Sequence, residues 1–263
     1  MGLGMVRAFA SAGMKVVAAD VRADVLDAVV AGVRADGHEA IAVPTDVSKL
    51  ADVDALAAAT MDAFGAVHVL CNNAGVGMFA PISRTTIDDW EWVLGIDLWG
   101  PIYGIKVFLP LIEQQEEGHI NSTSSVAGLV AGGAAGPYNV AKHGVVALMA
   151  TLERELRSAK SPVHTSVLCP GAVNTDIGRN SMENRRARHG RTSARTAEGD
   201  KLGDKMSEAL AGGMQPDEVG HLVLDAILSD QFWIFTEPRL LKHLQQQVEV
   251  MVADQSLTRL RLF

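Results

Sequence analysis

The fold is decided by three short apolar runs, KVVAAD at residues 15–20, AIAV at residues 40–43 and VHVLCNNAG at residues 67–75. Residues 24–36 and 50–64 separate these runs, and their apolar side chains recur at helical spacing. Short apolar runs of this kind are typical of parallel strands buried on both faces, with helices as the crossovers between them. The chain is therefore predicted to form an α/β fold with a doubly wound parallel sheet.

The rest of the chain continues the alternation. A helix is expected over residues 1–10 with no strand before it, and Pro101 is expected to kink or interrupt the long helical stretch 86–113. At 263 residues, one domain over 1–263 is the simplest expectation. Further strands are predicted at 119–123, 163–168 and 232–236, and further helices from near Pro137, at 216–228 and at 238–252.

Composition narrows the class of protein. The formal net charge of −8 argues against general binding of nucleic acid. No signal-peptide pattern opens the chain and no run reaches the roughly 18 apolar residues of a membrane helix, so no membrane is expected as a partner. Cys71 and Cys169 end apolar runs and are interpreted as buried free thiols, which fits a cytoplasmic protein.

The stretch SVAGLVAGGAAGPYNVAK, residues 125–142, carries the first candidate chemistry. Tyr138 and Lys142 are four residues apart, so on a helix their side chains share one face. A lysine ammonium within about 4–6 Å favours the phenolate and lowers a phenol pKa that is ordinarily about 10.

Tyr138 could then act as general base in alcohol oxidation and general acid in ketone reduction, while the upstream Ser125 holds the substrate oxygen. The alternative is that Tyr-x-x-x-Lys arises by chance, because the pattern is common.

Together with the strand end Asn72-Asn73-Ala74-Gly75 and the turn at residues 169–175, this stretch resembles the short-chain dehydrogenase/reductase family, from Gly2 to about Thr236. The resemblance implies a Rossmann-like fold and hydride transfer between NAD(H) and a secondary alcohol or ketone. It assigns Tyr138 as the acid/base, Lys142 as the residue that tunes it and binds the nicotinamide ribose, and Ser125 as the substrate-orienting hydroxyl. Asp97 stands where the family usually has an asparagine that anchors a water-linked proton path through the lysine.

Asp20 is the first cofactor candidate. A carboxylate about 20 residues beyond the glycine fingerprint accepts hydrogen bonds from the adenosine ribose in dinucleotide-binding folds, and Asp20 lies 18 residues beyond Gly2. The acid would repel a 2′-phosphate, so NAD is favoured over NADP, although Arg22 follows closely. A helix N-cap is the alternative for Asp20.

The resemblance implies three further groups of cofactor contacts, in addition to Gly2. Each also has a purely local alternative: an N-cap for Asp46, an ordinary turn for the strand end, and a strand-end loop for the proline-glycine turn. No cluster with metal-ligand spacing is visible, so no metal is expected. The groups are Asp46 and Val47 at the adenine, Asn73, Ala74 and Gly75 along the cofactor, and Pro170, Gly171, Val173 and Thr175 at the nicotinamide carboxamide.

Two segments bear on substrate and assembly. The resemblance makes residues 176–215 a substrate lid, in which Arg185, Arg186, Arg188 and Arg191 are interpreted as a solvated cluster, with an anion-binding site as the alternative. The tryptophan-rich stretch 86–113 is expected in the interface of a homodimer or homotetramer, with intramolecular core as the alternative.

The family's first central strand and most of its glycine-rich turn are predicted to be missing, because Gly2 matches the last glycine of that turn. Either Met1 is an internal methionine mistaken for the start, which is favoured, or the chain has a gapped sheet. The competing functional class follows from this: a catalytically impaired or silent member that acts only in binding or assembly.

Overall fold

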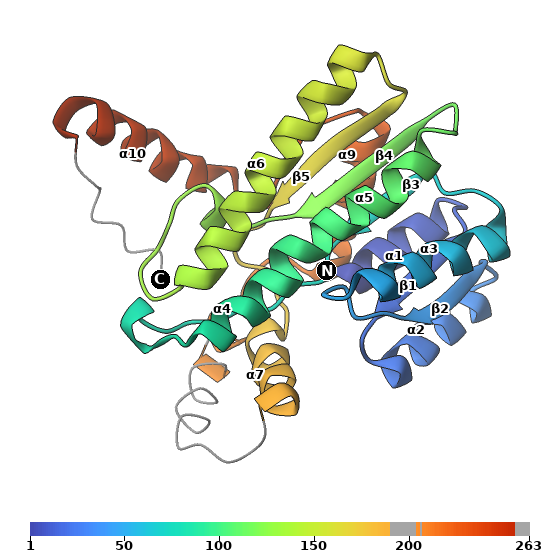
Figure 1. Ribbon diagram of the computed structural model, residues 1–263, viewed down its shortest axis with the longest axis horizontal. Helices are drawn as coiled ribbons and strands as arrows, with labels where there is room; N and C mark the ends of the chain where they lie inside the picture. The colour runs from blue at the N-terminus through green and yellow to red at the C-terminus, as the bar shows by residue number, and fades with distance from the viewer. Residues whose placement is uncertain (190–203, 206, 256–263) are drawn as a thin grey trace.

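The computed structural model describes residues 1–189, 204–205 and 207–255. All its paired strands run parallel, in two groups: β1 (Val16–Asp20) with β2 (Ala40–Pro44), and then β3, β4, β5 and β6 in that order. Figure 1 shows the two groups beside one another with helices around them. In the described part of the chain, no strand is hydrogen-bonded between β1 and β3.

The predicted elements are confirmed to within about three residues at their ends, including the helix that opens the chain; the largest difference is the last helix, which begins at Leu241 after a 3-10 turn over Pro238–Leu240. The remaining strands are β3 (Val69–Asn72), β4 (Gly118–Thr123), β5 (Val163–Cys169) and β6 (Trp233–Phe235). The helices are α1 (Gly2–Ser11), α2 (Ala23–Ala35), α3 (Leu50–Phe64), α4 (Ile87–Leu94), α5 (Gly100–Ile112), α6 (Gly136–Ala159), α7 (Ile177–His189), α9 (Pro216–Leu228) and α10 (Leu241–Asp254).

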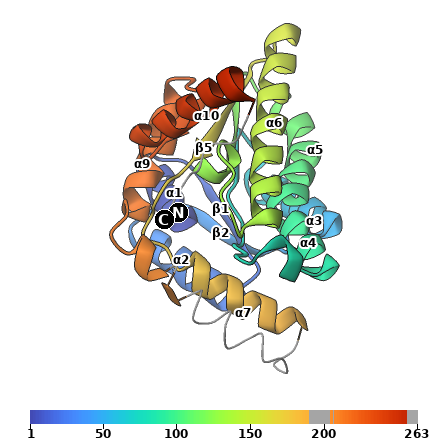
Figure 2. The same cartoon turned by 90° about the vertical axis from the view of Figure 1, so that its left-hand side faces the viewer.

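The helices form a layer on each side of the strands (Figure 2), with α3, α5 and α6 on one side and α1, α2 and α9 on the other. Ile120 of β4 and Val167 of β5 pack toward the first layer, and Leu168 of β5 packs toward the second. This alternation is what a parallel strand covered on both faces requires. The molecule is thus an α/β, Rossmann-like fold built as one domain.

Two glycines bring α1 against α9. A Cβ on Gly4 would lie 1.9 Å from the Pro216 carbonyl oxygen, and a Cβ on Gly220 would lie 2.2 Å from the Gly4 oxygen. Only glycine at both positions allows the two backbones to approach this closely. The contact fixes the N-terminus of α1 beside the carboxyl ends of the strands.

The long helical stretch is continuous from Ile87 to Ile112, so the predicted interruption at Pro101 is wrong. A π-helical turn, Gly95–Trp99, joins α4 to α5, and Pro101 falls in the first turn of α5, where a missing N–H is tolerated. Turns of this kind often mark functional positions. Asp97 lies within it.

The same run is the one described helix that is long and apolar enough to cross a membrane by length and composition. A helix in a protein core passes the same test, and this run supplies Ile105, Phe108 and Ile112 to the core against α6 and β4. Trp92 is also buried within the molecule, whereas Trp99 is 49% exposed. Both cysteines are free thiols, but only Cys169 is fully buried; Cys71 is half-buried.

Candidate active site

The start of α6 places the phenol and the ammonium together. Gly136 and Pro137 occupy the first turn, where proline is favoured, and Tyr138 and Lys142 follow on one face of the helix. The Lys142 ammonium nitrogen lies 5.6 Å from the centroid of the Tyr138 ring. Lys142 is 3% exposed, so its charge acts on the phenol with little water between them.

Ser125 follows the end of β4 and lies next to this pair. The loop after it packs tightly on α6: a Cβ on Gly128 would lie 2.6 Å from the Lys142 carbonyl oxygen, and the Ser124 hydroxyl donates to that oxygen at 2.8 Å. The Ser125 hydroxyl accepts the Ala127 N–H at 3.1 Å, and its presence beside the phenol acts to lower the pKa of Tyr138. The three predicted catalytic side chains are therefore brought to one place.

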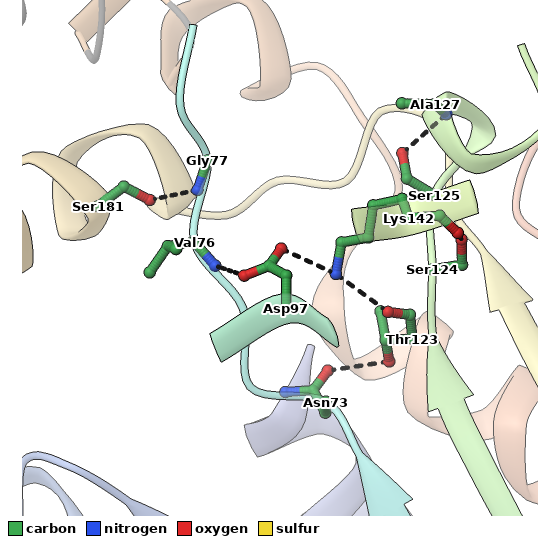
Figure 3. Close-up of polar contacts among 10 residues, drawn as sticks. All are labelled: Asn73, Val76, Gly77, Asp97, Thr123, Ser124, Ser125, Ala127, Lys142 and Ser181. Atoms are coloured by element: carbon green, nitrogen blue, oxygen red, sulfur yellow. Dashed lines mark hydrogen bonds and ion pairs between the residues drawn. The ribbon is translucent and has the colours of Figure 1, made fainter. Parts of the chain in front are cut away.

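Asp97 reaches the same site from the π-helical turn (Figure 3). Its Oδ2 lies 3.1 Å from the Lys142 ammonium, and its Oδ1 accepts the Val76 N–H at 2.8 Å. The ammonium also donates to the Thr123 carbonyl oxygen at 3.1 Å. Asp97 is completely buried, so this is a direct ion pair out of contact with water.

Burial and neighbouring charges shift the pKa values of Tyr138, Lys142 and Asp97 in opposing directions. Burial raises the pKa of Tyr138, Asp97 raises it further, and Lys142 and Ser125 lower it, with a net rise above the usual value of 10. Burial alone would lower the pKa of Lys142, but the neighbouring Asp97 and Tyr138 raise it above its usual value. Burial raises the pKa of Asp97 above its usual value, and Lys142 and the Val76 N–H offset only part of that rise. Since both Asp97 oxygens face donors, we assign it as a carboxylate paired with an ammonium.

The candidate adenine and ribose residues lie at the carboxyl ends of β1 and β2. Asp20 is at the end of β1; its carboxylate accepts the Arg22 N–H at 3.0 Å and lies 3.5 Å from the Arg22 guanidinium. Asp46 accepts the Ser48 N–H at 3.1 Å and the Ser48 hydroxyl at 2.6 Å. Neither is an N-cap, because Arg22 caps α2 and Lys49 caps α3, so that alternative is wrong for both.

The strand end after β3 lies between these residues and the catalytic group. Asn73 Oδ1 accepts the Thr123 hydroxyl at 3.4 Å, and a Cβ on Gly2 would lie 2.8 Å from Asn73 Nδ2. A Cβ on Gly75 would lie 3.3 Å from the Lys142 ammonium. Small residues at this edge let the backbone pass close to the Lys142–Asp97 ion pair. They also leave the backbone accessible to a ligand, as a dinucleotide site requires. Val47 follows Asp46 in the segment after β2, and Ala74 follows Asn73 in the segment after β3.

Two residues that follow β6 hold the turn after β5 in place. Gly171 N–H donates to the Thr236 hydroxyl at 2.9 Å, and Ala172 N–H donates to the Glu237 carboxylate at 3.2 Å. Val173 is buried and bridges to Met214. Pro170 and Thr175 begin and end this turn at the carboxyl edge of the strands.

Helix α7 borders the site, and three of its polar side chains bind the segment after β3 and helix α4. Ser181 accepts the Gly77 N–H at 2.7 Å, Asn184 accepts the Trp92 indole N–H at 2.9 Å, and Arg185 pairs with the buried Asp89 at 2.6 Å. Arg185 is thus no part of a solvated cluster, and that interpretation is wrong for this residue. Arg191, the side chains of Arg186 and Arg188, and residues 190–203 and 206 of the predicted lid lie outside the described residues.

Sequence reasoning missed the backbone partners of the site, namely the Thr123 carbonyl and the Val76 N–H, and the ion pair between Asp89 and Arg185. The position of Thr123 at a predicted strand end was the available signal for the first. Nothing in the sequence joins Asp89 to a residue 96 positions later. Within the described ranges, no three His, Cys, Asp or Glu side chains are grouped to hold a metal ion.

Comparison with known proteins adds a family. Residues 1–186 match the family model described as short chain dehydrogenase. The chain is 30% identical over 254 residues to the C alpha-dehydrogenase of a Sphingobium strain, covering 95% of this chain and 81% of that protein.

Solved structures agree with the match. A short chain dehydrogenase/reductase from Burkholderia phymatum in complex with NAD is 36% identical, with a TM-score of 0.89, over 98% of this chain and 92% of that one. A metagenomic short-chain oxidoreductase in complex with NADP is 27% identical, with a TM-score of 0.67, over 89% of this chain and 88% of that one.

The expectation of a missing first strand and glycine-rich turn is not confirmed, because the family model matches from residue 1. The match covers every predicted member of the catalytic group and every predicted cofactor residue, from Gly2 to Thr175. The extent of this match and the identity to curated relatives lead to one conclusion: the chain belongs to the short-chain dehydrogenase/reductase family and is an oxidoreductase of that family.

Proposed function

We propose that the protein transfers a hydride between a nicotinamide cofactor and a secondary alcohol or ketone, with Tyr138 as the proton donor and acceptor. One observation carries the proposal: the Tyr138 ring and the Lys142 ammonium lie 5.6 Å apart on one helix face, next to the hydroxyl that follows β4. Phenol, ammonium and hydroxyl are the groups that proton transfer at an alcohol oxygen needs.

In the reductive direction, the Tyr138 hydroxyl donates its proton to the carbonyl oxygen as negative charge develops there. Ser125 donates a hydrogen bond to the same oxygen and holds it in line with the phenol. The Lys142 ammonium stabilises the phenolate that remains until solvent returns a proton. In the oxidative direction, the phenolate accepts the alcohol proton.

The residues present fit a nicotinamide cofactor. An ammonium carries three N–H donors. Among the described contacts, Lys142 donates one hydrogen bond, to the Thr123 carbonyl oxygen, and pairs with Asp97 by charge, so donor capacity remains for a ribose hydroxyl. Gly75 lacks the Cβ that would fill the space above that ammonium. The cofactor, when bound, would supply or accept the hydride.

We assign the adenosine end to Gly2, Asp20, Asp46 and Val47, the centre to Asn73, Ala74 and Gly75, and the nicotinamide end to Pro170, Gly171, Val173 and Thr175. NAD is favoured over NADP because the Asp20 carboxylate, at the carboxyl end of β1, would repel a 2′-phosphate. Its contact with Arg22 supports the same choice, since Asp20 occupies the guanidinium that would otherwise be free for that phosphate.

The substrate is proposed to be a small alcohol or ketone held beside α7, which belongs to the described part of the predicted lid. The polar contacts of Ser181, Asn184 and Arg185 hold α7 against Gly77 and α4. We further propose a cytoplasmic homodimer or homotetramer. The exposed Trp99, which packs against Tyr103 in a tilted arrangement with ring centroids 5.5 Å apart, supports an apolar contact between subunits.

One observation favours the second candidate, a catalytically silent member used in binding or assembly. No described strand joins β1 to β3, and a cofactor would have to span both groups. Titration of the protein into NADH, followed by cofactor fluorescence, and assay of an alcohol panel with NAD separate the two. Binding with turnover supports the enzyme; no cofactor binding would support the silent member.

A further inference from the structure

Asp97 lies in an unusual place for a carboxylate: inside the molecule, in the π-helical turn, with a charged partner. Its Oδ2 is 3.1 Å from the Lys142 ammonium, and its other oxygen is occupied by the Val76 N–H at 2.8 Å (Figure 3). Neither Asp97 nor Lys142 is more than 3% exposed. In such surroundings two opposite charges act on each other strongly, and water screens them little.

The same ammonium lies beside the Tyr138 ring, so Asp97 and the Tyr138 phenolate compete for one positive charge. With Asp97 ionised, the pair is already neutral before the phenol loses its proton. A phenolate next to a neutral pair gains less than a phenolate next to a lone ammonium.

We propose that Asp97 is a positioning residue and a built-in counter-ion that holds Lys142 in place and keeps the Tyr138 phenol protonated through neutral pH. The site then has its proton donor ready for carbonyl reduction over the neutral range, and alcohol oxidation accelerates only as the pH becomes alkaline. The pH preference rests on the proposed function, whereas the effect of Asp97 on the phenol does not.

The other charged groups around the pair do not replace Asp97. Burial raises the pKa of the Cys169 thiol, at the end of β5, to about 12, so it stays neutral. On α4, the buried Asp89 is paired with Arg185 of α7. Ser125 and Thr123, from the end of β4, contribute a hydroxyl and a carbonyl and carry no charge.

The chain allows a direct test, because it contains two tyrosines, Tyr103 and Tyr138. In a Tyr103→Phe background, the ultraviolet absorbance of tyrosinate reports the ionisation of Tyr138 without substrate or turnover. Asp97→Asn in this background removes the charge and keeps an oxygen for the Val76 N–H. Asp88→Asn, an exposed acid on the same helical run, is the matched control for net charge.

The expected result is that Asp97→Asn moves the midpoint of tyrosinate formation to lower pH, while Asp88→Asn leaves it unchanged. An unchanged or higher midpoint in Asp97→Asn would overturn the proposal. If Asp97→Asn does not fold, the Tyr103→Phe protein alone still tests the proposal. The pH midpoint of Tyr138 ionisation in that protein should lie above the value for free tyrosine, about 10, and a midpoint below about 10 contradicts the proposal.

The pH dependence of alcohol oxidation provides a second test of the proposal. In Asp97→Asn with Tyr103 intact, the rise of kcat/KM for alcohol oxidation should shift to lower pH together with the tyrosinate midpoint. A shifted midpoint with no activity in any variant would refute the proposed function and leave the counter-ion role standing. An unshifted profile in an active enzyme would refute the proposed link between Asp97 and the reaction.

Discussion

The Lys142 ammonium donates to the Thr123 carbonyl oxygen at 3.1 Å, which links α6 to the end of β4, the strand that precedes Ser125. The proposed proton donor Tyr138, the Lys142 charge and the Ser125 hydroxyl are therefore held by the same contact between α6 and β4. The same ammonium forms an ion pair with Asp97, as Figure 3 shows. The consequences for stability and catalysis can be measured separately.

Lys142→Met should destabilise the fold as well as the reaction, because it leaves Asp97 buried without its partner. Removing one member of a buried ion pair costs about 3–5 kcal/mol. The double variant Asp97→Asn/Lys142→Met should unfold at higher denaturant concentration than Lys142→Met, since no buried charge remains. Urea unfolding measures both. Equal stability of wild type and Lys142→Met would show that the pair is not buried as described.

His119 should make the stability pH-dependent. Burial lowers its pKa to about 4, and its Nε2 lies 2.9 Å from the Ser166 hydroxyl. Because the folded state holds the neutral form, its contribution is complete above the unfolded pKa of about 6.5 and is lost as pH falls toward 4. The loss attributable to this residue is about 3 kcal/mol.

The check is the free energy of unfolding in urea between pH 7 and pH 4. His119→Gln should flatten the slope, and His221→Gln, an exposed histidine of α9, should leave it unchanged. The same slope in wild type and His119→Gln would assign the pH dependence to other groups.

Asp20 should set cofactor choice. Asp20→Ala removes a charged acceptor from the proposed ribose site and frees the Arg22 guanidinium, which lies 3.5 Å from the carboxylate. A hydrogen bond to a charged group is worth about 1.5–3 kcal/mol, roughly 10- to 100-fold in affinity. The ratio of kcat/KM for NAD over NADP should fall by about that factor, and Asp24→Asn on the exposed start of α2 should not change it. A wild type that prefers NADP would contradict the assignment.

The contacts of α7 should affect substrate more than chemistry. Arg185→Met leaves Asp89 unpaired and should loosen α7 from α4, with faster amide hydrogen exchange in α7. The expected kinetic result is a higher KM for substrate with a smaller change in kcat. Arg179→Met, whose partners are exposed, is the control. A fall in kcat with KM unchanged would place Arg185 in the chemistry instead.

The sequence predicted most of the fold because most of the parallel strands are short apolar runs that alternate with helical segments, as Val69–Asn72 does. Local patterns cannot reveal how a proline is accommodated, and Pro101 proved harmless because a π-helical turn precedes it. Tyr138, Lys142 and Ser125 were predicted from their spacing in the sequence, because helix and strand geometry determine which side chains at a given spacing lie close together. The roles of Thr123, Asp89 and Arg185 depend on tertiary contacts between distant segments, which spacing does not encode.

Tyr138→Phe tests the central claim most directly. The ring and its contact with Phe79 remain, with ring centroids 5.9 Å apart, and only the proton carrier is removed. With an alcohol that wild type oxidises, kcat should fall by about 10²-fold or more, while the Kd for NAD changes no more than a few-fold and Tyr103→Phe behaves as wild type. Near-normal kcat in Tyr138→Phe, with cofactor bound and the protein folded, would contradict the account.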